Sequence, residues 1–125
     1  MNVLDAVTLE LEPTATYCRR EIQFFPADDT SDGILIIRQW FRSFRRGTQR
    51  LNQESDLYQL IEADPPPGVM ARAFALLNIA DDSQELPYKV LVGRNRSCTC
   101  KGGRCKVPEC KHESACEALI REGVL

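Results

Sequence analysis

Residues 98–112 read CTCKGGRCKVPECKH, a run in which two short ligand pairs are separated by nine residues. The pairs are Cys98-Thr-Cys100 and Cys110-Lys-His112, so the pattern is C-x-C-x9-C-x-H. Structural zinc sites use four cysteine or histidine donors at tetrahedral angles. The two pairs together supply one such set, and four protein donors leave no open position at the metal. We therefore predict a structural Zn²⁺ that contributes folding free energy to a segment with little apolar core.

Two further cysteines lie close enough in the sequence to be alternative ligands. Cys105 falls between the two pairs. Cys116 follows His112 by four residues, so Cys116 and His112 can share one face of a helix. The remaining cysteine, Cys18, stands alone and is expected to be a small buried hydrophobic residue. His112 is the only histidine in the chain, so as a metal ligand it is not free to act as a general base.

The segment from Tyr88 to Leu125 resembles the SWIM zinc finger. The residues that carry the resemblance are the strand-like YKVLV, the C-x-C pair, the C-x-H pair, and a following helix with small and aliphatic residues that ends in ALIREGVL. The preceding RAFALLNI fits the first strand of the hairpin in that family. The resemblance implies a ββα zinc-binding module, of a kind generally assigned to DNA binding or protein interaction.

The chain has 125 residues, the size of one domain, and 43% of them are hydrophobic. We expect a continuous compact domain of the α+β class. Residues 1–70 would form a β-rich part of unknown role, and residues 71–125 the SWIM-like module. An antiparallel sheet or meander of four or five strands would fill most of the chain.

Apolar periodicity and turn formers predict the individual elements. We expect strands over residues 17–25, 34–44, 57–63, 72–79 and 88–92, a polar loop over 45–56, irregular structure over 64–68 (DPPPG), and a helix over 113–122. Residues 34–44 are ambiguous, because Ile37, Trp40, Phe41 and Phe44 also have the spacing of one helix face. These aromatic side chains are expected to lie in the core.

The net charge of −2 hides strongly charged blocks. Residues 38–50 hold five arginines and no acid, and residues 88–111 hold seven basic residues against one glutamate. Six basic side chains surround the predicted zinc loop: Arg94, Arg96, Lys101, Arg104, Lys106 and Lys111. Since three thiolates on Zn²⁺ carry a formal charge of −1, the loop stays positive and can contact phosphates of nucleic acid.

The alternative function is that of a protein-interaction adaptor with a purely structural zinc. A sheet edge, or an aromatic patch of Trp40, Phe41 and Phe44, would then contact a protein partner. Trp40 with its flanking arginines could also stack on bases.

Enzymatic activity is not expected. The chain has no Gly-rich phosphate loop, no serine–histidine pair once His112 is a ligand, and no carboxylate cluster tied to the metal, so no small-molecule substrate is evident. The first dozen residues are acidic rather than basic, unlike a signal peptide. The longest apolar run is Ile34–Ile37, far short of the roughly 20 residues that span a bilayer. We expect an intracellular protein without a membrane partner, cytoplasmic or, in a eukaryote, nuclear.

Overall fold

The computed structural model describes residues 6–80, 86–100 and 110–125. These residues form a seven-stranded sheet and a C-terminal helix, in agreement with the α+β class, although we expected four or five strands. The elements are β1 (Val7–Leu11), β2 (Arg19–Phe25), β3 (Gly33–Arg45), β4 (Thr48–Ala63), β5 (Ala71–Asn78), β6 (Tyr88–Gly93), β7 (Ser97–Cys98) and α2 (Lys111–Arg121). Each strand pairs antiparallel with the next, so the sheet is a meander.

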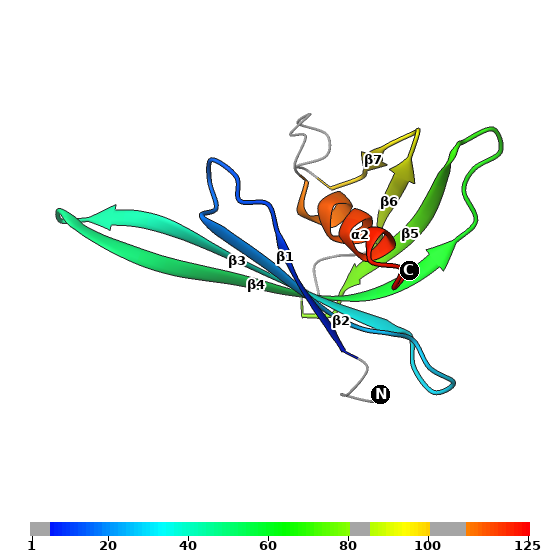
Figure 1. Cartoon of the computed structure of the whole chain (residues 1–125), viewed down its shortest axis with the longest axis horizontal. Helices are drawn as coiled ribbons and strands as arrows, with labels where there is room; N and C mark the ends of the chain where they lie inside the picture. Colours follow the sequence, from blue (N-terminus) through cyan, green and yellow to red (C-terminus); the bar gives the residue numbers. More distant parts are fainter. Residues whose placement is uncertain (1–5, 81–85, 101–109) are drawn as a thin grey trace.

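The core lies between the sheet and α2 (Figure 1). The helix contacts β1 at one end of the strand order and β6 and β7 at the other, which requires the sheet to curve around it. Ala115, Cys116 and Leu119 project from α2 into this core and are fully buried. The sheet supplies the other buried apolar side chains, among them Ile22, Leu35, Tyr58, Phe74, Leu76 and Val90.

The ambiguous residues 34–44 belong to a strand. Buried and half-buried residues alternate along β3, with Leu35 and Ile37 facing the core and Ile34 and Ile36 on the opposite face. A period of two is that of a strand, so the helical alternative is wrong. Our assignment of residues 72–79 and 88–92 to strands is confirmed by β5 and β6, and DPPPG forms no regular element. The connection between β5 and β6 includes residues 81–85, which lie outside the described part.

The prediction of a polar loop over residues 45–56 is wrong. Arg46 and Gly47 have φ angles of 53° and 75° and join β3 to β4 in a two-residue hairpin turn. Positive φ at both central residues matches the twist of the flanking strands, and this holds Arg45 opposite Thr48. Main-chain pairing with β3 then keeps residues 48–56 extended, although their side chains are mostly polar.

The far end of this hairpin extends beyond the rest of the sheet (Figure 1). The last β3 residue paired with β2 is Trp40, and β5 pairs with β4 only from Tyr58 onward. We call residues 41–52 the β3–β4 arm. It lies beyond the cover of α2. The expectation that Trp40, Phe41 and Phe44 lie in the core is wrong, because Trp40, just before the arm, and Phe41 are half-buried, and Phe44 is 75% exposed.

Two N-terminal features also differ from expectation. Strand β1 was not predicted, and it pairs with β2 from Val7↔Phe24 to Leu11↔Arg20. Cys18 is exposed rather than buried, because it precedes β2 at the margin of the sheet, where its thiol donates to the carbonyl of Trp40.

The sheet continues past residue 70 through the pairing of β4 with β5, and the division at residue 70 stays a prediction.

The helix begins at Lys111, two residues earlier than expected, directly after Cys110. Gly123, with φ of 76°, follows the end of α2 in the left-handed conformation that glycine adopts at low cost. Within the described residues, no helix combines the length and the apolar character needed to cross a bilayer.

Leu119→Ala tests the core between α2 and the sheet. Leu119 is fully buried, so we expect the free energy of unfolding in urea to fall by about 3 kcal/mol. Leu51→Ala is the matched control, because Leu51 is 63% exposed on the arm and its truncation should cost about 0.5 kcal/mol or less. Equal effects of the two substitutions would contradict the assignment of α2 to the core.

Candidate metal centre

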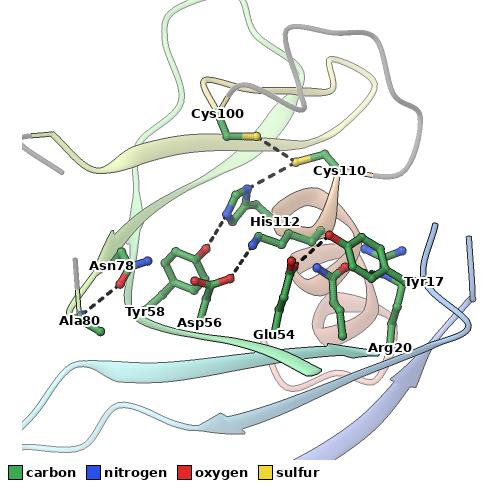
Figure 2. Close-up of polar contacts among 12 residues, drawn as sticks. Tyr17, Arg20, Glu54, Asp56, Tyr58, Asn78, Ala80, Cys100, Cys110 and His112 are labelled. Carbon is green, nitrogen blue, oxygen red and sulfur yellow. Dashed lines mark hydrogen bonds and ion pairs between the residues drawn. The ribbon is translucent and has the colours of Figure 1, made fainter. Parts of the chain in front are cut away.

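Four of the predicted ligands come together in one buried cluster. Cys98 ends β7, Cys100 follows two residues later, Cys110 precedes α2, and His112 lies in the first turn of α2. Their donor atoms all lie within 4.8 Å of one another, and the four residues are only 4–6% exposed. Figure 2 shows Cys100, Cys110 and His112 converging from the end of the sheet and the start of the helix. The cluster can hold a metal ion.

The separations between donor atoms suit a tetrahedral ion. The Sγ atoms of Cys100 and Cys110 are 3.4 Å apart, and Nδ1 of His112 lies 3.5 Å from Cys110 Sγ and 3.7 Å from Cys98 Sγ. Usual zinc bond lengths place two sulfurs about 3.8 Å apart, and a sulfur and a nitrogen about 3.6 Å apart. The four side chains therefore need little movement to coordinate an ion.

The orientation of His112 is set by its other ring nitrogen. Nε2 lies 2.9 Å from the hydroxyl of Tyr58 on β4, which leaves Nδ1 facing the thiols (Figure 2). Metal-binding histidines commonly donate their second N–H to such a partner, and this holds the ring in place. The rings of Tyr58 and Tyr88 also contact the imidazole, at centroid distances of 5.1 and 4.9 Å.

The electrostatics of the cluster favour a bound cation. The hydrogen bond between Cys98 and Cys110 lowers the pKa of the Cys110 thiol and raises that of Cys98, because one thiol donates to a thiolate. Burial alone would lower the pKa of His112, but its hydrogen bonds to Cys100 and Cys110 raise it overall. Thiolates this close repel one another, so full ionisation of all three needs a positive ion between them.

Of the two alternative ligands, Cys116 does not join the cluster. It is fully buried among the apolar side chains of the core, and burial raises the pKa of its thiol to about 12. Both properties are those of a small hydrophobic residue. Cys105 lies outside the described residues.

The six basic residues predicted to contact nucleic acid have different surroundings. Lys111 pairs with Asp56 of β4, and Arg96 pairs with Glu117 at 3.0 Å and Glu113 at 3.7 Å. Arg94 is exposed and forms no ion pair with another described residue. Lys101, Arg104 and Lys106 lie outside the described part of the chain. Two of the six basic residues, Lys111 and Arg96, therefore form ion pairs that link α2 to the sheet and to the β6–β7 connection.

Tyr58 is the site residue that sequence reasoning missed. The LYQLIEA segment predicts a strand with Tyr58 and Leu60 on one face, but no local pattern connects Tyr58 to a histidine 54 residues later. Only the pairing of strands brings them together.

Comparisons with protein families, with curated proteins and with solved structures gave no match. Fold and site thus define a curved antiparallel β-sheet protein with a candidate Cys3His metal centre at the start of its C-terminal helix. The resemblance to the SWIM zinc finger stays a prediction from the ligand spacing, the strands before it and the helix after it.

Tyr58→Phe tests how His112 is oriented. The substitution removes the hydroxyl that pairs with Nε2 and keeps the ring, so we expect affinity for Zn²⁺ to fall about 10- to 100-fold. Competition with a chromophoric chelator measures this change. Tyr88→Phe is the control, because its ring also contacts His112 but its hydroxyl is not the partner of Nε2. Equal affinities for the two variants would contradict the orientation described.

Proposed function

We propose that the Cys3His cluster binds Zn²⁺ and that this zinc is structural. The observation that carries the proposal is the burial of all four donors within 4.8 Å of one another. Three thiolates and one imidazole are a common donor set of structural zinc, whereas catalytic zinc keeps one position for water or substrate. Cys98, Cys100, Cys110 and His112 would fill the tetrahedron.

We infer that the role of the metal centre is non-catalytic, and the same contacts support this. A general base needs a free lone pair, but Nδ1 of His112 faces the thiols and Nε2 pairs with Tyr58. The carboxylate of the neighbouring Glu113 lies 3.7 Å from the guanidinium of Arg96, so it pairs with a cation instead of serving as a base at the metal. The metal would instead join the end of the sheet to α2, whose eleven residues are too few for a stable isolated helix.

Cys110→Ala tests the ligand assignment, with Cys116→Ala as its matched control. Purified Cys110→Ala should lose its bound zinc and melt at a lower temperature, whereas Cys116→Ala should keep one zinc per chain. Zinc content by mass spectrometry and thermal melts with and without chelator measure both effects. The assignment fails if Cys110→Ala retains zinc and its melting temperature, or if Cys116→Ala loses the metal.

We further propose that the protein binds nucleic acid. In the sequence, basic residues lie close to the four ligands, and Arg94, Lys101, Arg104 and Lys106 remain candidates for phosphate contacts. A zinc ion with three thiolates adds a charge of only −1 to this region. The acidic whole-chain balance means that such contacts would be local rather than spread over the surface.

Binding of the zinc-loaded protein to labelled DNA, followed by fluorescence anisotropy, tests this function. We expect binding at about 50 mM salt that weakens linearly on a logarithmic salt scale, because phosphate contacts release counterions. Arg94→Gln should weaken binding and reduce the salt slope by about 1. Absence of binding to both duplex and single-stranded DNA at this salt would contradict the function and favour the adaptor role.

A further inference from the structure

The β3–β4 arm carries a concentration of positive charge that forms no ion pairs within the described residues. Residues 41–52 hold four arginines and no acidic residue. None of the four forms an ion pair with another described residue. By contrast, five arginines elsewhere in the described residues pair with glutamates: Arg19, Arg38, Arg72, Arg96 and Arg121. The charge of the arm is therefore available to an external partner.

The arginines are spread around the arm rather than lying on one face. Side chains opposite each other in an antiparallel pair share a face, so Arg42 lies with Leu51, and Arg50 with Ser43, on the opposite face. Arg45 shares the face of Arg50, and Arg46 lies in the turn. An anionic partner that contacts all four must surround the ribbon on more than one side.

The dimensions of the arm suit the major groove of DNA. The five residues of β3 beyond Trp40 extend about 17 Å at the usual rise per residue. The major groove of B-DNA is about 12 Å wide and 8.5 Å deep and admits a two-stranded ribbon, with phosphates along both margins. The major groove of an RNA duplex is too narrow for such an insertion.

The aromatic residues argue against a platform for single strands. Such platforms use several open rings on which successive bases stack. The Trp40 ring is already covered by the guanidinium of Arg19, 4.6 Å from its centroid, and Phe41 makes an edge contact with Tyr17. Phe44 remains the open ring of the arm, with the exposed side chain of Leu51 on the same face.

We propose that the β3–β4 arm binds duplex DNA by lying in the major groove. Phe44 and Leu51 face the base edges together with Arg42, and apolar side chains there can contact thymine methyl groups. Arg45 and Arg50 lie on the outer face and reach the phosphates along the margins of the groove. The inference rests on the proposed binding of nucleic acid, but it assigns that binding to a surface remote in sequence from the zinc loop.

The test compares two triple variants of the full-length, zinc-loaded protein. R42Q/R45Q/R50Q removes charge from the arm, and K89Q/R72Q/R121Q removes the same charge from β5, β6 and α2. Binding to a labelled DNA duplex of about two helical turns is measured at several salt concentrations. We expect the arm variant to lose at least about tenfold in affinity near 100 mM salt, with a salt slope reduced by about 3. The control should change by about threefold or less, because distant charges are screened.

The outcomes separate this inference from the proposed function. If the wild type binds neither duplex nor single strand, the proposed function itself fails. If the wild type binds duplex DNA and the arm variant binds equally well, or if both triple variants lose the same affinity, the arm assignment is overturned while DNA binding stands. Tighter binding of the wild type to the single strand than to the duplex would overturn insertion in the groove. Unchanged zinc content and circular dichroism establish that each variant is folded.

Discussion

The imidazole of His112 joins three parts of the chain that are far apart in sequence. It belongs to the first turn of α2, its Nε2 pairs with Tyr58 of β4, and its Nδ1 faces the thiols at the end of β7 and the start of the helix. The helix that follows contacts both ends of the strand order, so its placement determines how the sheet curves. An ion in the Cys3His cluster would therefore stabilise the curvature of the whole sheet as well as the segment that supplies the ligands.

The packing of α2 on the sheet divides the molecule into two parts. The body is the part of the sheet that packs with α2, and the β3–β4 arm extends beyond it. In the body, ion pairs such as Arg72–Glu62 and Lys111–Asp56 link neighbouring elements, and the apolar side chains meet α2. On the arm, α2 does not cover the side chains, and the four arginines have no acidic partner in the described structure. The low net charge of the chain is thus the sum of an acidic body and a basic ribbon. This division is compatible with a proposed structural metal in the Cys3His cluster of the body and a proposed binding surface on the β3–β4 arm.

The parts of the fold that follow local patterns could be predicted, and the parts set by long-range pairing could not. The spacing of Cys98, Cys100, Cys110 and His112 predicted the cluster, because each pair is local and only the two pairs had to meet. The turn formers before residue 34 and the β-branched residues that follow them predicted the strand β3. The polar composition of residues 45–56 predicts a loop, since nothing in it shows that the turn at Arg46-Gly47 pairs residues 48–56 with β3. Tyr58 was missed for a similar reason, and Phe44 was misplaced because its exposure depends on where α2 ends its cover of the sheet.

X-ray absorption at the zinc edge tests whether the site is a closed Cys3His centre, since it separates sulfur ligands of the bound ion from the lighter nitrogen or oxygen ligands. For protein purified with its metal, we expect three sulfurs at about 2.3 Å and one nitrogen at about 2.0–2.1 Å, with no further ligand. The nitrogen signal should disappear in His112→Ala. Four sulfur ligands, a coordinated water, or protein that folds with no zinc at all would contradict the claim that Cys98, Cys100, Cys110 and His112 form a closed structural site.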